Sequence, residues 1–206
     1  RLIRRQRQMC IRDRIDESVL VEQARRGDTQ ALERLMLRYQ DRIFNVILKI
    51  CANYHDAAEL TQETFVKIVE NIPDFEGRSG FYTWAFRIAV NLTITHCRRK
   101  AKGDVKSLNS EVGAADEQAK RTLAEFLADE HTPDPAEVAS NNELCDIALR
   151  LLMKLDEQQR TVVVLRDIEG MNYLQIARVL DVGLGTVKSR LSRARGSLRR
   201  IMEGML

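Results

Sequence analysis

Apolar side chains recur at steps of three and four residues through most of this 206-residue chain, and that spacing predicts an all-helical fold. The longest example is residues 29–51. Its helix-spaced positions are Leu32, Leu35, Tyr39, Ile43, Val46, Ile47 and Ile50. Comparable spacing predicts helices over residues 19–26, about 56–71, 81–102, 143–155, 156–170, 172–182 and 183–201. The intervening residues 52–56 and 73–80 are predicted loops.

Short polar side chains and glycines mark the expected ends of these helices. The predicted N-caps are Ser18, Asp28, Asp156 and Asn172, and the predicted stops are Gly27 and Gly170. The apolar run at 162–165 could form a buried strand, but its helical surroundings favour a helix.

Charge is unevenly distributed, although the net charge is only +3. Residues 166–200 carry eight basic and three acidic side chains, whereas residues 104–143 carry ten acidic and three basic ones. We therefore expect two helical domains, at 15–102 and 141–206, joined by a flexible acidic linker at 103–140 with one helical turn near 120–128. Residues 1–14 carry six arginines and form either a basic arm or a mis-extended reading frame.

The segment 183–201 combines a buried stripe with a purely basic face. Val187, Leu191, Ala194, Leu198 and Ile201 form the stripe, and no acidic residue occurs between Asp181 and Glu203. Because like charges repel, this face is best explained by contact with a polyanion. Together with residues 172–182, and a turn expected at Gly183 and Gly185, it has the layout of a helix-turn-helix.

Two further segments carry possible contact residues. Five aromatic residues lie within residues 75–86, and the cations Arg87, Arg98, Arg99 and Lys100 follow. This pattern fits either the stacking of unpaired bases or a helical core with a basic end. The exposed acids of residues 56–71 form either a solvated face or a protein-docking surface.

Several function classes lack support in the sequence. There is no phosphate-binding loop, zinc-protease motif or nucleophile elbow, so we expect no catalysis and no cofactor. The four cysteines are scattered singly, which argues against a metal site or disulfide framework. No apolar run is long enough to cross a membrane, and we expect a cytoplasmic protein.

Three stretches, in this order, resemble the extracytoplasmic-function sigma factors of bacterial RNA polymerase, in the sigma-70 family. They are residues 56–68, 80–100 and 155–200. The resemblance implies a region 2 helical bundle at 15–102, a region 4 helix-turn-helix domain at 141–206, and a role in promoter-specific initiation, in response to an envelope or environmental signal. It implies core polymerase, through its clamp and flap, and promoter DNA as partners, together with an anti-sigma factor.

The resemblance also implies roles for individual residues. The clamp would be bound by Asp56, Glu59, Gln62 and Glu63. The −10 element would be bound and melted by Glu76, Gly77, Arg78, Ser79, Tyr82, Trp84, Arg87, Asn91, Arg98, Arg99 and Lys100. The −35 element would be read by Thr186, Lys188, Ser189, Arg190, Ser192, Arg193 and Arg195.

Two other functions remain possible from the residues alone. A helix-turn-helix regulator would bind duplex DNA tightly as a dimer without polymerase. A protein-interaction adaptor would use its basic helix for docking and would show no salt-dependent DNA binding.

Overall fold

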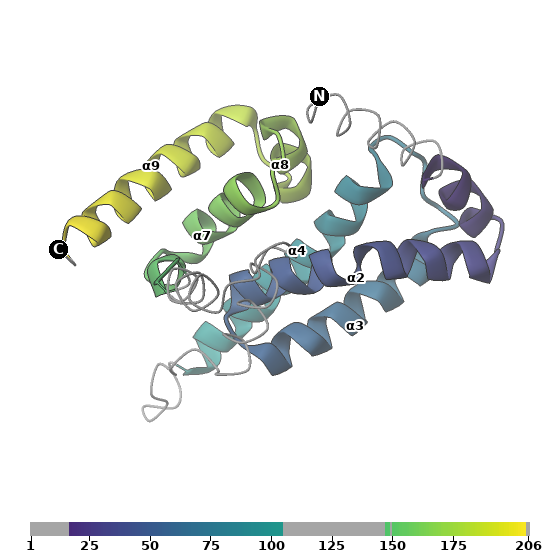
Figure 1. The fold of residues 1–206 in the computed structure, drawn as a ribbon, viewed down its shortest axis with the longest axis horizontal. Coiled ribbons are helices and arrows are strands. Elements are labelled where there is room, and N and C mark those ends of the chain that lie inside the picture. Colours follow the sequence, from purple (N-terminus) through teal and green to yellow (C-terminus); the bar gives the residue numbers. More distant parts are fainter. Residues whose placement is uncertain (1–16, 105–146, 149, 205–206) are drawn as a thin grey trace, which may run out of the picture.

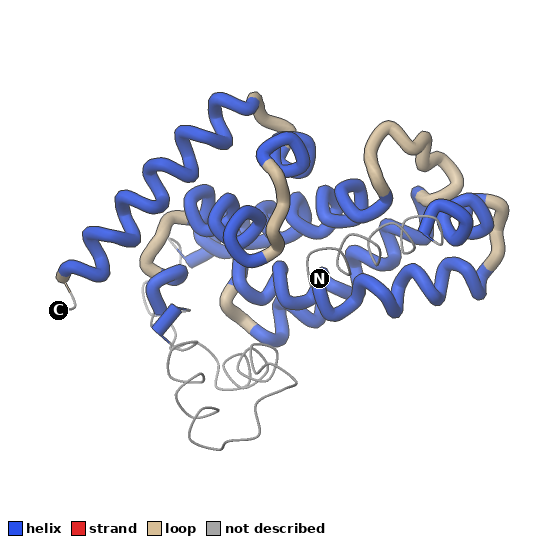
Figure 2. The backbone as a smooth tube through the Cα atoms, turned by 45° about the horizontal axis from the view of Figure 1, so that its top comes forward, coloured by secondary structure: helices blue, strands red, loops and turns tan. Residues whose placement is uncertain are grey.

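The computed structural model describes residues 17–104, 147–148 and 150–204, and these residues contain helices and loops but no strand (Figure 2). The elements are a helix at 17–25, α2 (Thr29–Cys51), α3 (Tyr54–Asn71), α4 (Phe81–Asp104), helical residues at 147–148 and 150–153, α7 (Glu157–Val163), the π-helical turn η1 (Val164–Ile168), α8 (Tyr173–Leu180) and α9 (Leu184–Glu203). The predicted all-helical fold is confirmed. The N-terminal basic segment and the predicted linker, with its helical turn, lie outside the described residues except for 103–104.

The first unit, residues 17–104, is a bundle in which α2, α3 and α4 surround a common core. The Asp28 carboxylate accepts hydrogen bonds from the backbone N–H groups of Gln30 and Ala31, which fixes the start of α2 as predicted. Ala52 ends α2 in a left-handed conformation with φ 59°, and Asn53 then caps α3. Since these two caps are adjacent residues, α3 packs directly back along α2.

The second unit, residues 147–148 and 150–204, contains the predicted helix-turn-helix. Asp156 caps α7, and the predicted cap Asn172 forms a reciprocal capping box with Gln175 at the start of α8. Residues 162–165, the possible strand, are helical, although the hydrogen bonds shift to π-helical spacing from Val164. Gly170, with φ 68°, ends this stretch as predicted.

Three local predictions are wrong in detail. Ser18 already lies inside the helix at 17–25, and Tyr54–His55 belong to α3 rather than to the predicted loop. The turn between α8 and α9, expected at Gly183 and Gly185, lies at 181–183 instead. Asp181 is left-handed with φ 53°, Gly183 is the extended N-cap of α9, and Gly185 lies within α9.

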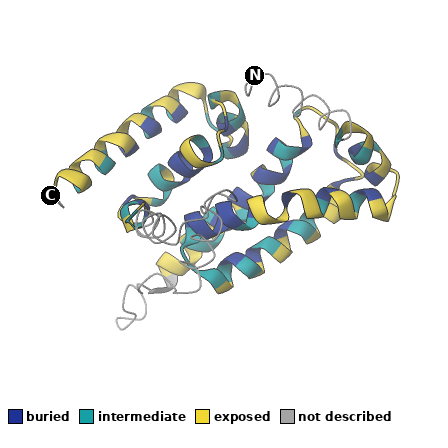
Figure 3. Ribbon diagram, in the orientation of Figure 1, coloured by how far each residue is buried: buried dark blue, intermediate teal, exposed yellow. Residues whose placement is uncertain are grey.

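The two units pack against each other in this structure. In Figure 1, α7 and α8 lie between α9 and the bundle of the first unit, so that α9 runs along the outside. Helix α8 contacts α4, while α7 and η1 contact α2. The buried apolar residues of both units form one continuous cluster. Figure 3 shows that α9 turns buried residues inward and exposed residues outward.

Candidate nucleic-acid interface

The outer face of α9 is the most strongly cationic helix surface of the second unit. Val187, Leu191 and Ala194 are buried against the unit, which leaves Lys188, Ser192 and Arg193 exposed. No side chain caps the first turn of α9, because its N-cap is Gly183. Free N–H groups at a helix start, together with exposed cations, suit contact with DNA phosphates.

The other predicted −35 residues are held more closely by the chain itself. Thr186, Ser189 and Arg190 are half-buried. The Ser189 hydroxyl donates to the Thr186 carbonyl at 3.0 Å. Arg195 forms an ion pair with Asp167, 2.9 Å between Nη2 and Oδ1, and this pair fixes α9 to the residues that follow α7.

The aromatic residues near the start of α4 serve mainly as core. Phe75, Phe81 and Phe86 are buried, as the helical-core interpretation predicts. Trp84 is half-buried, with its ring centroid 5.0 Å from that of Phe75. Tyr82 is also half-buried and packs on Phe86 at 4.4 Å. Only Trp84 and Tyr82 of this cluster therefore retain surface that a base could reach.

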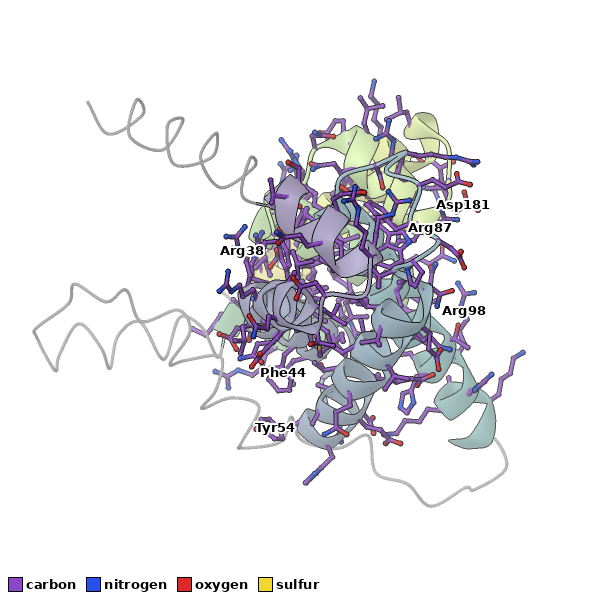
Figure 4. All side chains as sticks on the ribbon, turned by 90° about the vertical axis from the view of Figure 1, so that its right-hand side faces the viewer. Arg38, Phe44, Tyr54, Arg87, Arg98 and Asp181 are labelled. Carbon is purple, nitrogen blue, oxygen red and sulfur yellow. The ribbon has the colours of Figure 1, made fainter. Side chains whose placement is uncertain are left out.

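The polar residues of α4 form an exposed row beside this aromatic cluster. Arg87, Asn91 and Arg98 are exposed and follow helical spacing, so that they share one face of α4. Arg87 and Arg98 project on the same side of the molecule in Figure 4. Arg99 and Lys100 are exposed further along, and so are Glu76, Gly77 and Arg78 in the preceding loop, with Ser79 half-buried. Glu76 and Arg78 form an ion pair within that loop.

A cavity of about 210 Å³ lies where this face of α4 meets the second unit. From α4 it is lined by Asn91, Ile94 and Arg98. Its other walls are Gln158, Thr161, Leu180, Val182 and Arg190. Two predicted −10 residues, Asn91 and Arg98, and one predicted −35 residue, Arg190, therefore line the same cavity, and both units contribute to its walls.

Carboxylates of the second unit contact three of the predicted −10 residues, Tyr82, Arg87 and Arg98. The Glu169 side chain is only 6% exposed, and its Oε2 accepts hydrogen bonds from Arg42 at 2.9 Å and from the Tyr82 hydroxyl at 3.1 Å. Burial, and then the charge of Glu169, raises the pKa of Tyr82 above its ordinary value. Asp181 lies 3.8 Å from Arg87, and Glu157 lies 3.4 Å from Arg98.

The predicted polymerase-binding residues differ in their exposure and in their contacts. Glu59, Gln62 and Glu63 are exposed on α3, beside the exposed apolar side chains of Val66 and Val69. Asp56, by contrast, contacts two side chains of α4 within the bundle. Its Oδ2 accepts a hydrogen bond from Lys100 at 2.9 Å and lies 3.2 Å from Nε2 of His96.

The surroundings of Asp56 change its ionisation. Burial by itself would raise the pKa of Asp56, but the contacts from Lys100 and His96 outweigh burial and hold the pKa below its usual value. Lys100, which the sequence assigns to −10 phosphates, is therefore engaged with α3 in this structure.

Two residues at the boundary between the units escaped the sequence analysis. Arg42 and Glu169 are 127 residues apart, and nothing local in the sequence pairs them. The sequence does give a partial indication of a basic row on α2, since Arg34, Arg38 and Arg42 recur every four residues. Within the described part of the chain, no group of three or more His, Cys, Asp or Glu side chains is placed to hold a metal ion. No helix in that part is long and apolar enough to span a bilayer.

Both units of this chain are similar to known proteins. The family model of Sigma-70 region 2 matches residues 35–103, and that of Sigma-70, region 4 matches residues 145–198. The RNA polymerase sigma-H factor of Pseudomonas aeruginosa is 32% identical over 191 residues, covering 91% of this chain and 94% of the relative. The ECF RNA polymerase sigma factor SigW of Bacillus subtilis is 33% identical over 180 residues, covering 87% and 93%.

Two solved structures share the fold. CnrH in complex with the cytosolic domain of CnrY superposes with a TM-score of 0.62 at 23% identity, covering 92% of this chain and 98% of that one. The sigma factor RpoE from Bartonella quintana, in complex with the anti-sigma factor NepR, gives 0.64 at 21% identity, covering 83% and 96%. The extent and identity of the sequence matches establish that the chain belongs to the extracytoplasmic-function sigma factors of the sigma-70 family, which are transcription initiation factors.

Proposed function

We propose that the two units of this sigma factor divide promoter recognition between the −35 duplex and the melted −10 strand. The observation that carries the proposal is the outer face of α9, which exposes Lys188, Ser192 and Arg193 and directs no acidic group outward between them. This face enters the major groove of the −35 element. Lys188 and Arg193 contact phosphates or guanine edges, and Ser192 allows close approach.

The first unit binds the −10 element through the exposed row on α4 and the loop that precedes it. Asn91 and the partly exposed rings of Trp84 and Tyr82 receive unstacked bases, and Arg87 and Arg98 bind the backbone. Extruding a base costs a few kcal/mol of stacking, which contacts in such a pocket repay. Promoter melting therefore depends on this face being free.

Core polymerase docks on α3 and carries out the chemistry. Glu59, Gln62 and Glu63 supply polar contacts to the clamp, while Val66 and Val69 add apolar area at the same surface. The second unit contacts the flap. The sigma factor itself is not an enzyme. Because core polymerase operates there, it acts in the cytoplasm.

An anti-sigma factor holds this chain inactive until an environmental signal arrives. Support comes from the solved neighbour RpoE, whose partner NepR is an anti-sigma factor. A partner that binds both units at once gains affinity from effective concentration.

Run-off transcription with cognate bacterial core polymerase on a promoter library tests this function. Transcripts from discrete start sites should appear only when the chain is added. The double variant Lys188→Ala with Arg193→Ala should abolish −35-dependent starts. Arg200→Ala, a matched loss of charge on the last turn of α9, should leave them intact. Unchanged initiation by the double variant would contradict the assignment of α9.

A further inference from the structure

One buried anion joins the two units, and it is a side chain of the second unit. Glu169 follows η1, and its Oε2 is held by the Arg42 guanidinium of α2 and the Tyr82 hydroxyl of α4. Arg42 also lies over the Tyr82 ring, with Cζ 4.7 Å from the ring centroid. Two donors from different helices thus converge on a single oxygen.

This arrangement has the chemistry of a phosphate site. A guanidinium fixed against an aromatic ring presents its N–H fork in a set direction, and arginine binds carboxylate and phosphate oxygens with the same fork. The Tyr82 hydroxyl supplies a second donor to the same point. Since Arg42 is 44% exposed, its free N–H groups can still reach a ligand outside the protein.

Two further cations of α4 also pair with carboxylates of the second unit. Asp181 faces Arg87 at 3.8 Å, and the two are side by side in Figure 4. Glu157 faces Arg98 at 3.4 Å. Each of these two cations belongs to the face assigned above to the −10 backbone, and each meets an acid of the second unit. Arg160 strengthens the junction, because its Nη1 donates to the Ile50 carbonyl of α2 at 2.8 Å.

We propose that Arg42 and Tyr82 form a phosphate-binding site for the −10 strand, which the Glu169 carboxylate occupies in this arrangement. The second unit therefore covers the −10 face of the first, and the strand gains access only when the units separate. This inference rests on the proposed function, because it takes α4 to be the −10 face. It adds Arg42 as a DNA-binding residue and Glu169 as the internal anion that competes with DNA.

The test compares two variants that break the same ion pair from opposite sides. Binding of the full chain, without polymerase, to a labelled single-stranded −10 oligonucleotide is measured by fluorescence anisotropy. The oligonucleotide is taken from a promoter selected in the run-off experiment. Glu169→Gln removes the competing charge and keeps the site, so affinity should rise about tenfold. Arg42→Gln removes the site as well, so affinity should not rise. Glu203→Gln, on the last turn of α9, is the matched control and should leave affinity unchanged.

Salt dependence identifies the ligand as phosphate. Each phosphate contact on a single strand contributes about 0.7 to the slope of log affinity against log salt. The slope for Glu169→Gln should exceed that for the double variant Arg42→Gln with Glu169→Gln by about this amount. Equal affinities and slopes in these two chains would show that Arg42 binds no phosphate, and would overturn the proposal.

A second assay separates failure of this proposal from failure of the −10 assignment. Promoter opening by the complete holoenzyme is followed by 2-aminopurine fluorescence with Asn91→Ala. If Asn91→Ala slows promoter opening while Glu169→Gln leaves oligonucleotide affinity unchanged, the −10 assignment is supported and the proposal that Glu169 covers this face is refuted. If Asn91→Ala and Arg98→Ala both leave opening unaffected, the −10 assignment fails and this proposal falls with it.

Discussion

Asp56 offers the clearest test of whether a residue of α3, the helix proposed to dock polymerase, has a structural role. Its carboxylate accepts a hydrogen bond from Lys100, lies 3.2 Å from His96 Nε2, and sits in the first turn of α3, where negative charge is favoured. Asp56→Asn removes the charge and keeps the shape. Lys100 is half exposed, which weakens its ion pair, so the combined loss should be about 1–2 kcal/mol of unfolding free energy. For a chain of this size, that lowers Tm by roughly 2–4 °C for each kcal/mol.

The pH dependence of this loss follows from the depressed pKa of Asp56. A carboxyl whose folded-state pKa lies below its unfolded value adds stability that is fully present above the unfolded value. That stability is lost as pH falls through the folded value. The difference between wild type and Asp56→Asn should therefore shrink toward zero as the pH falls below about 4.

Urea denaturation followed by circular dichroism, at pH 7 and in steps below pH 5, measures this difference. Glu63→Gln is the control, because Glu63 is exposed on the same helix and its loss should change stability by less than about 0.5 kcal/mol. A difference between wild type and Asp56→Asn that persists at the lowest pH would refute the electrostatic explanation. Equal stability at pH 7 would show that the contacts of Asp56 contribute nothing.

Two further predictions concern local structure. Asn172→Ala removes the capping box of α8 and should lower the unfolding free energy by about 1 kcal/mol, measured by urea denaturation, whereas Asn172→Asp should retain most of it. Burial raises the pKa of the Cys51 thiol to about 12, so at pH 8 only about one thiol in ten thousand is ionised. Alkylation of Cys51 by iodoacetamide, followed by peptide mass spectrometry, should be far slower in the native chain than in urea; equal rates would contradict the burial.

The sequence predicts the helices and their caps well, because both depend on neighbouring residues. The carboxylates of Asp28 and Asp156 and the amide of Asn172 each accept backbone N–H groups two or three residues ahead, and this geometry is written in the local order of residues. The turn before α9 shows the limit of such reasoning. Gly183 and Gly185 predict a turn at 183–185, but the turn begins earlier, at Asp181, a residue type that tolerates the left-handed conformation.

The π-helical turn and the junction between the units depend on contacts far apart in the chain. At η1 the backbone N–H of Glu169 bonds to the Val164 carbonyl, five residues back, and no propensity in residues 164–168 signals that shift. The sequence suggests that Tyr82 could stack on a base, but in the structure its hydroxyl donates a hydrogen bond to Glu169, 87 residues later. Asp56 likewise reads as a surface acid, although α4 brings Lys100 and His96 to it.

The strength of the junction decides how readily the two units separate. The pairs Arg87–Asp181 and Arg98–Glu157 involve exposed arginines at 3.4–3.8 Å, so each contributes little and is screened by salt. Glu169 is buried and hydrogen-bonded twice, and it resists screening. Separation of the units must therefore break the contacts of Glu169 and the hydrogen bond from Arg160 to the Ile50 carbonyl, and must separate the apolar surfaces of α4 and α8. Polymerase binding can supply that free energy only if docking on α3 and on the second unit favours the separated arrangement, because a ligand shifts a two-state equilibrium only through its differential affinity for the two states.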